Sequence, residues 1–456
     1  MQAVVIGAGE VGSAIVGALT AENVVVVAID QDQQKLDVLN DAYDIQTVCG
    51  SGSDPETFRS AQIQDADLIV AVTDSDEVNI VSCAVSRLCS PLARRVARIR
   101  SESLFSSMAA LEPLGFRIEF PINPERLAAE RLQRIVASPF AIDVVDFGSE
   151  LSLLGVRVPA QAAIVGKTFS ELRAALPHPP LLVAARIRDN QVRIPRGNDD
   201  IRSGDLLYVV MDPNDTAALA QMLALPSRHT DRVFIAGGTG IGEILARTLE
   251  TTTKMSVKLI EADAEQADKL AEGFDRTLVL HGSPTNENLL REENIRECDA
   301  FVAALPEEEI NVLVALNAHR LGARRVIALS NQTAYIPIIF KSGIDAVVSP
   351  KALAISTILQ HIRTGSVRRV LTFSMGGDML IIEFEAVPTS EVVGHPLHTL
   401  RFPDGALVGA IIRDNRPIIP DGNEVLQPGD RVFIFAQHKA VKRLEKMMAV
   451  SFDFFG

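Results

Sequence analysis

The chain has 456 residues and a formal net charge of −14, with 58 acidic side chains against 44 Lys and Arg. At roughly 100–200 residues per domain, this length predicts about two to four domains, and the apolar share of 47% excludes a disordered or fibrous chain. Because nucleic acids and anionic membranes attract basic surfaces, the acidic excess argues against both as general partners.

The N-terminal region, residues 1–123, alternates short apolar strands with segments of helical period, such as residues 12–19 and 78–88. Strands that are apolar throughout are typical of a parallel sheet buried on both faces, so we expect a Rossmann-like domain. The expected strands are residues 4–6, 24–29, 47–49, 68–72 and, as the last one, 96–99.

A glycine-rich segment follows the first expected strand and opens a helix, which is the context that a dinucleotide-binding loop requires. Its first glycine allows a tight turn, its second lets the backbone approach a pyrophosphate, and its third lets the helix pack on the sheet. The helix N-terminus offers N–H groups to phosphates. The segment consists of Gly7, Ala8, Gly9, Glu10, Val11 and Gly12.

Asp30 ends the next expected strand. A carboxylate there accepts hydrogen bonds from an adenosine ribose and repels a 2′-phosphate, which favours NAD(H) or adenine nucleotides over NADP(H). The alternative is that the glycines and Asp30 only shape a turn.

Two further groups are expected near the same crevice. Thr73 and Asp74 follow the strand LIVAV, at the edge where ligands bind in such sheets; alternatively, Asp74 and Glu77 form a helix capping box. Arg98 and Arg100 would share one face of the strand, where phosphate contacts or a solvated ion pair would explain two neighbouring cations.

A second type of domain is expected at residues 140–226, after a connector helix at 124–139 that begins with Pro124. Short strands, read as alternating in polarity, and turn pairs such as Asp189-Asn190, Gly197-Asn198 and Gly204-Asp205 predict a small α+β domain, with room for two helices.

The rest of the chain repeats this order. Gly7 and Gly12 match Gly237 and Gly242, and IRDN recurs with Gly204-Asp205 matched by Gly429-Asp430. Such a repeat predicts a duplication. We therefore expect a second Rossmann-like domain at 230–349, a connector helix at 350–366 and a second small domain at 367–456. The expected class is α/β, with two Rossmann-like doubly wound parallel-sheet domains alternating with two small α+β domains.

The second glycine segment departs from the pattern. Thr239 replaces the second glycine, and Ala328 and Ser330 replace Arg98 and Arg100, whereas Glu261 keeps the ribose acid. We expect weaker or different nucleotide binding there. The segment consists of Gly237, Gly238, Thr239, Gly240 and Ile241.

Other classes of site find little support in the sequence. Four cysteines without zinc spacing are expected to be buried or idle thiols, and the eight histidines are scattered, including His178 and His395 in loops. No catalytic triad, metal cluster or P-loop is recognisable, and no apolar run approaches the ~20 residues of a membrane span. The first residues enter a strand directly, so no signal peptide is expected. The Phe-rich end, residues 452–456, is expected to pack on its own domain or to dock a partner.

The series GAGEVG, VVVVAID, GSGSD, DLIVAVTDSDEVN and RVARIRS resembles the N-domains of regulators of potassium conductance, and VGKTFSEL, IRDN and GD resemble their C-domains. The whole arrangement is similar to the NAD-binding peripheral subunits of bacterial Trk potassium uptake systems. The resemblance implies a cytoplasmic ring, usually a tetramer, docked on a membrane potassium channel subunit. It also implies NAD(H) and ATP or ADP as competing or alternating effectors, and no enzyme activity.

The resemblance implies first-site contacts from Gly7–Val11, Asp30, Thr73, Asp74 and Arg98, and second-half counterparts from Gly238–Ile241 and Glu261. We expect ATP and NADH to contact Arg98 and Arg100 differently and so to bias the state of the ring. Two alternatives remain open: an NAD-dependent oxidoreductase and a nucleotide-sensing regulator of another cation transporter.

Overall fold

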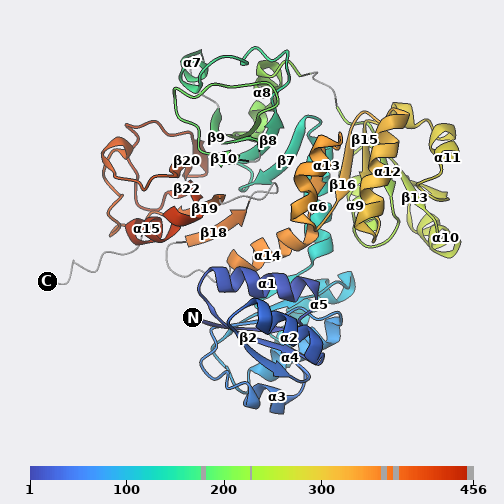
Figure 1. Cartoon of the computed structure of the whole chain (residues 1–456), viewed down its shortest axis with the longest axis vertical. Helices are drawn as coiled ribbons and strands as arrows, with labels where there is room; N and C mark the ends of the chain where they lie inside the picture. Colours follow the sequence, from blue (N-terminus) through green and yellow to red (C-terminus); the bar gives the residue numbers. More distant parts are fainter. Residues whose placement is uncertain (176–180, 190, 226–228, 361–366, 373–378, 449–456) are drawn as a thin grey trace. The chain divides into compact units, whose positions relative to one another are not determined.

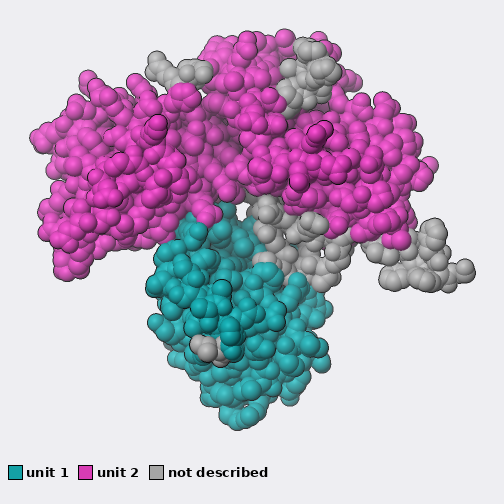
Figure 2. Space-filling model, turned by 180° about the vertical axis from the view of Figure 1, so that it is seen from behind, with its two compact units in different colours: residues 1–127, 350–363 teal, residues 128–349, 364–456 magenta. Residues whose placement is uncertain are grey.

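The computed structural model describes residues 1–175, 181–189, 191–225, 229–360, 367–372 and 379–448. The chain forms two compact units, coloured separately in Figure 2. Unit 1 consists of residues 1–127 and 350–363, and unit 2 consists of residues 128–349 and 364–456. His178, Asn190 and the Phe-rich segment 452–456 lie outside the described residues.

Unit 1 contains a six-stranded parallel sheet with the order β3-β2-β1-β4-β5-β6, drawn in blue in Figure 1. Alternate strand residues enter two apolar cores: Val5 and Val26 on one face, Val4 and Val27 on the other. The doubly wound fold is thereby confirmed. Its elements are β1 (Gln2–Ile6), α1 (Glu10–Ala21), β2 (Val25–Asp30), α2 (Gln33–Ala42), β3 (Gln46–Cys49), α3 (Pro55–Ser60), β4 (Leu68–Ala71), α4 (Asp76–Ser86), β5 (Arg94–Arg98), α5 (Glu102–Leu111), η1 (Glu112–Leu114), β6 (Phe120–Ile122), α6 (Pro124–Ala137), which continues into unit 2, and α14 (Pro350–Gln360).

The sheet has one strand more than the sequence predicts. The strand at residues 94–98 is followed by β6, which pairs with it in parallel as the edge strand. Pro121 lies in this strand, and proline is tolerated at a sheet edge because a missing N–H costs nothing on the open side.

In unit 2, the first small domain is an antiparallel sheet with the order β10-β9-β11-β8-β7. The expectation of alternating strands is wrong here, because the central strand β11 is buried along its whole length. The elements are β7 (Ala141–Asp146), β8 (Ser152–Arg157), α7 (Phe169–Ala175), β9 (Leu181–Arg188), β10 (Gln191–Arg193), β11 (Leu206–Met211), η2 (Pro213–Asp215) and α8 (Thr216–Met222).

The second Rossmann-like domain repeats the first topology, with the order β14-β13-β12-β15-β16-β17. Its elements are β12 (Arg232–Ala236), α9 (Ile241–Thr252), β13 (Ser256–Glu261), α10 (Ala264–Gly273), β14 (Leu278–His281), α11 (Glu287–Glu292), η3 (Ile295–Glu297), β15 (Ala300–Ala303), α12 (Glu308–Leu321), β16 (Val326–Leu329), η4 (Thr333–Tyr335), α13 (Ile336–Lys341) and β17 (Ala346–Val348).

The second small domain is a five-stranded antiparallel sheet, β18-β19-β22-β20-β21. In both small domains, the buried aspartate of the repeated Gly-Asp pair forms an ion pair with a partly exposed arginine: Arg188 and Asp205 lie 2.6 Å apart, and Arg413 and Asp430 lie 2.8 Å apart. The elements are β18 (Val367–Thr372), β19 (Met379–Glu385), η5 (Leu397–Thr399), β20 (Ala406–Arg413), β21 (Arg416–Ile418), β22 (Arg431–Gln437) and α15 (His438–Met448).

Among the residues that the structure describes, no helix combines the length and the apolar character needed to cross a membrane. Cys83 and Cys298 are buried, and burial raises the pKa of each thiol to about 12. Both therefore stay protonated near neutral pH, which agrees with the expectation of idle thiols.

Candidate functional site

A pocket of about 590 Å³ opens in unit 1 at the carboxyl ends of the parallel strands. It lies where the strand order reverses, between β1 and β4, which is where open α/β sheets bind ligands. The pocket brings together eight of the eleven first-half residues that the sequence singles out: Gly7, Gly9, Glu10, Val11, Asp30, Thr73, Asp74 and Arg98. Ala8, Gly12 and Arg100 do not line it.

The glycine loop has the geometry that its sequence predicts. Gly7 has a φ of +103°, which disfavours any other residue. A Cβ on Gly12 would lie 1.7 Å from the carbonyl oxygen of Gly7, whereas a Cβ on Gly9 would meet nothing within 4 Å. Gly7 and Gly12 therefore shape the turn, and Gly9 keeps space open in the pocket.

The N-terminus of α1 is free of side-chain caps. Asp32, Asp54, Ser75 and Ser101 each accept a backbone N–H at the start of α2, α3, α4 and α5, but Gly9 caps α1 without any side chain. The first N–H groups of α1 thus have the partial positive charge and the unsatisfied donors that bind phosphate.

Asp30 holds the loop and also lines the pocket. Its Oδ2 accepts the N–H of Ala8 at 2.6 Å, and its Oδ1 accepts the N–H of Asp32 at 2.9 Å. The carboxylate therefore shapes the turn, as the structural alternative holds, while its place on the pocket wall suits a ribose contact.

Asn79 supports the pocket, although the sequence does not single it out. It is fully buried, and its Oδ1 accepts the N–H and the hydroxyl of Thr73 at 2.8 and 2.7 Å. Its Nδ2 donates to the carbonyl oxygens of Thr73 and Arg98 at 3.1 and 2.9 Å. Asn79 thus fixes the ends of β4 and β5 on either side of the pocket.

Arg98 brings a half-buried positive charge to the pocket. Its Nη1 lies 3.5 Å from Asp74 Oδ1, and its Nε is buried without a hydrogen-bond partner. Burial, together with the nearby charge of Arg100, lowers the pKa of the Arg98 guanidinium. A guanidinium group at a pocket wall fits an anionic ligand.

For two neighbouring features, the structure differs from one of the alternatives that the sequence leaves open. Arg100 is exposed and donates to the carbonyl oxygen of Asp74 instead of facing the pocket. The start of α4 is capped by Ser75, which accepts the N–H of Val78, and not by an Asp74–Glu77 capping box.

The second glycine loop keeps the turn but carries a side chain at the position of the second glycine. Gly237 has a φ of +107°, and Glu261 Oε2 accepts the N–H of Gly238 at 2.8 Å, as Asp30 does for Ala8. Thr239 stands where Gly9 keeps space open, and Ser330 bonds Glu308 where Arg100 would be. Gly240 and Ile241 begin α9, and Ala328 is buried in β16.

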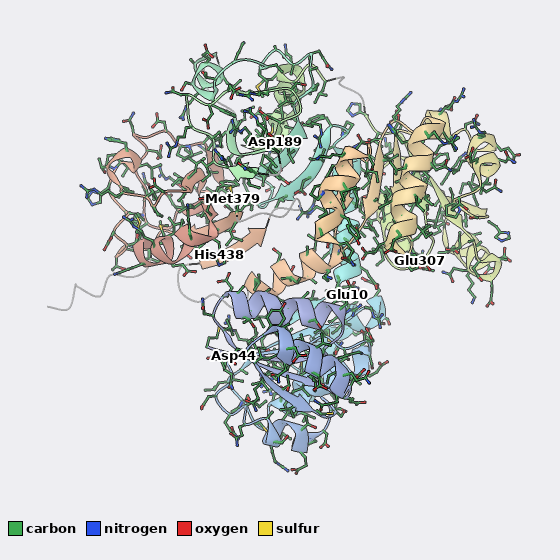
Figure 3. All side chains as sticks on the ribbon, viewed as in Figure 1. Glu10, Asp44, Asp189, Glu307, Met379 and His438 are labelled. Atoms are coloured by element: carbon green, nitrogen blue, oxygen red, sulfur yellow. The ribbon has the colours of Figure 1, made fainter. Side chains whose placement is uncertain are left out.

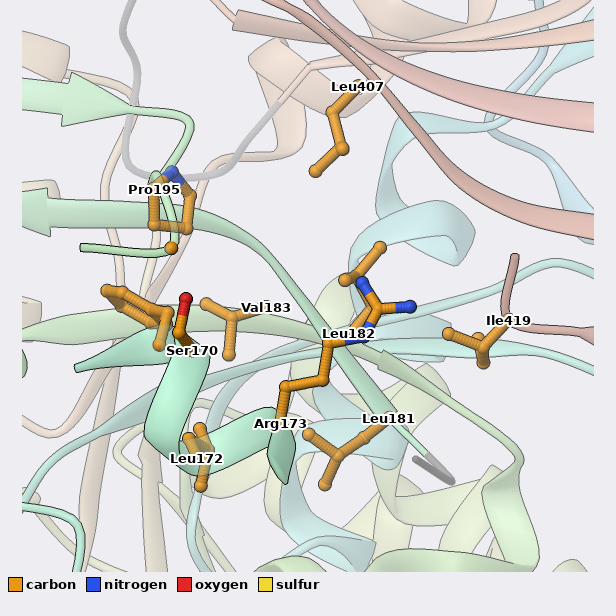
Figure 4. A pocket seen from close by; sticks show the side chains of 11 residues that line it. Ser170, Leu172, Arg173, Leu181, Leu182, Val183, Pro195, Leu407 and Ile419 are labelled. Carbon is orange, nitrogen blue, oxygen red and sulfur yellow. The ribbon is translucent and has the colours of Figure 1, made fainter. Parts of the chain in front are cut away.

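A second pocket, of about 230 Å³, lies within unit 2 between the two small domains (Figure 4). Its walls are apolar residues of the first small domain together with Leu407 and Ile419 of the second, and Ser170 and Arg173 add polar groups. No group of His, Cys, Asp or Glu among the described residues is arranged to hold a metal ion.

The repeat also appears in comparisons with known proteins. The TrkA-N domain matches residues 3–116 and 233–350, and the TrkA-C domain matches residues 153–224 and 381–449. The Trk system potassium uptake protein TrkA of Halomonas elongata is 33% identical over 459 residues, covering 100% of both chains. The chain belongs to the TrkA family. TrkA of Vibrio alginolyticus is 34% identical, with 96% of each chain covered.

Solved structures confirm the fold. The RCK domain of GsuK has a TM-score of 0.61 at 18% identity and covers 98% of this chain and 94% of its own. The GsuK channel bound to NAD also has a TM-score of 0.61, at 17% identity, covering 98% of this chain and 78% of its own. The TrkA relatives and the RCK fold thus agree on the same tandem architecture.

Proposed function

We propose that this chain is a nucleotide-sensing regulatory subunit of a Trk-type potassium uptake system and that its first Rossmann-like domain binds NAD(H) and ATP or ADP. The observation that carries the proposal is the pocket in which the uncapped start of α1, the open space at Gly9 and the half-buried Arg98 meet. A volume of about 590 Å³ suits a nucleotide.

Each group has a role in the proposal. The N–H groups from Gly9 to Val11 face the phosphates, Arg98 supplies a charge-assisted hydrogen bond, and Asp30 accepts from the adenosine ribose. Thr73 and Asp74 form the opposite wall, on the β4 side. The second loop, with Thr239 in place of Gly9, binds nucleotides more weakly or not at all.

The relatives support the partner that we propose, and the assembly is part of the same proposal. Proteins named Trk system potassium uptake protein TrkA support a membrane potassium channel subunit as the partner. The GsuK channel, solved bound to NAD and bound to ADP, supports both classes of nucleotide as ligands. We place the chain at the cytoplasmic face of the membrane, held there by the channel subunit, as a homotetramer with a regulatory and not a catalytic role.

Control of the channel requires that nucleotides prefer different states of the subunit. Arg98 is the group best placed to distinguish them, because a γ-phosphate adds charge that a nicotinamide ribose lacks. Arg100 acts through the carbonyl of Asp74, which it holds.

The proposal is tested by calorimetry and thermal unfolding of the full chain with NAD, NADH, ATP and ADP. A ligand of the native state raises the unfolding midpoint. We expect Asp30→Asn, which keeps an oxygen to accept the Ala8 N–H, to weaken all four ligands together. Asp44→Ala, on an exposed carboxylate outside the pocket, is the matched control.

Absence of binding by all four nucleotides would overturn the proposal, and loss of only one ligand in Asp30→Asn would overturn the ribose assignment. Oxidation of NADH with a carbonyl substrate would instead favour the oxidoreductase. Copurification with a different transporter would favour another regulatory partner.

A further inference from the structure

Helix α14 lies far from α1 in the sequence but packs against it within unit 1, as Figure 1 shows in orange and blue. Ala354 and Ile358 are buried in the same apolar core as Ile15 and Leu19. In the sequence, α14 stands between β17 of the second Rossmann-like domain and β18 of the second small domain. A segment of the second half of the chain thus forms part of the domain that carries the nucleotide pocket.

The first turn of α14 places a charge beside that pocket. Lys351 Nζ lies 2.8 Å from Oε1 of Glu10, and the lysine side chain is only 21% exposed. Glu10, labelled in Figure 3, is the first residue of α1 and lines the pocket. The ammonium group of Lys351 therefore contacts a residue that lines the pocket.

Without Lys351, the carboxylate of Glu10 would repel a phosphate bound at the N-terminus of α1. A carboxylate in the first turn is favoured by the helix dipole, but the same N-terminus is where phosphates would bind, and two anions there repel each other. The Lys351 ammonium group offsets the carboxylate and leaves the N–H groups of α1 to attract an anion.

The pair is specific to the first half of the chain. Gly240 stands at the place of Glu10 in the second glycine loop, and Glu125, which follows the first proline of α6, stands at the place of Lys351. Neither charge recurs, so the duplication alone does not account for the pair.

We propose that Lys351 is a specificity-determining residue of the first nucleotide site and that it acts by offsetting the charge of Glu10. This rests on the nucleotide binding proposed above. The more negative charge a nucleotide carries, the more it gains from Lys351, so ATP depends on this residue more than NAD does. Because coupling is reciprocal, ATP also strengthens the hold of α1 on α14, the helix that leads toward the second small domain.

The test is calorimetry of the full chain with ATP and NAD. We expect Lys351→Ala to weaken ATP about fivefold and NAD by a smaller factor. Lys351→Arg should restore the wild-type affinities, and Lys351→Ala should have a smaller effect in a Glu10→Gln background, where no carboxylate needs to be offset. Lys254→Ala, on an exposed lysine of unit 2, is the matched control.

Hydrogen exchange gives the reciprocal readout: ATP should slow exchange of α14 amides in the wild type and not in Lys351→Ala. Unchanged ATP affinity in Lys351→Ala overturns this inference but leaves the proposed function in place. An equal loss of ATP and NAD affinity overturns it too, because the residue would then be merely structural. A wild-type chain that binds neither ligand overturns both proposals.

Discussion

At the scale of single residues, the pocket depends on Arg98, a charged side chain that is mostly buried. Arg98 is held at the end of β5, where Asn79 donates to its carbonyl oxygen and accepts the N–H of Thr73 after β4. Its pKa is lowered mainly by burial, so its charged form is poorly solvated. A phosphate in the pocket that accepts a hydrogen bond from the guanidinium group would compensate that cost.

We therefore expect Arg98→Ala to weaken ATP and NADH by roughly tenfold or more, since a hydrogen bond to a charged group contributes about 1.5–3 kcal/mol. The loss should be greater for ATP. The ligand-free unfolding midpoint should change little, because the Arg98–Asp74 contact is long and Asp74 is exposed. Arg59→Ala, on an exposed arginine of α3, serves as control. Unchanged affinities in calorimetry would contradict the role of Arg98.

At the scale of elements, different glycines of the loop between β1 and α1 serve the fold and the nucleotide pocket. Gly12 faces the carbonyl of Gly7, so a side chain there must push α1 away from the sheet, whereas a side chain on Gly9 projects into open space. The same helix carries Glu10, where α14 makes contact. The residues of one short segment thus pack against the sheet, line the pocket and contact a helix from the second half of the chain.

Gly12→Val should lower the thermal unfolding midpoint of the ligand-free protein by several degrees, because its Cβ would lie 1.7 Å from an oxygen atom. Gly9→Val should leave that midpoint close to wild type and abolish the stabilisation by ADP or NADH. Differential scanning fluorimetry distinguishes the two. A Gly9→Val protein that is still stabilised by nucleotide would show that the phosphates do not lie against this loop.

Elements with a strong local signal could be predicted from the sequence. The glycine loop, Asp30 and the apolar strands needed only their spacing and their neighbours along the chain. The sequence does not predict the edge strand β6, because this strand has only three residues and contains Pro121, which carries no strand signal. The sequence leaves the cap of α4 open, since Asp74 and Ser75 are both good caps and only the backbone conformation decides between them.

At the scale of the whole chain, a motif that recurs in both halves makes different contacts in each half. The motif ARRV occurs in both halves, and its second arginine is buried in each. Arg95 donates to carbonyl oxygens of its own domain, including Cys83 and Ser90, whereas Arg325 donates to Ile135 and Ser138 at the end of α6. The contacts of Arg325, like that of Lys351 with Glu10, join residues distant in the sequence, so no local pattern could predict them.

We propose that nucleotide occupancy of the first Rossmann-like domain controls potassium flux. The most direct measurement is potassium flux into vesicles that hold a Trk-type membrane subunit together with this chain, with ATP or NADH added. We predict that nucleotide changes the flux with the wild-type chain, and that Gly9→Val assembles with the membrane subunit but gives no response. A Gly9→Val chain that responds to nucleotide as the wild type does would contradict the account.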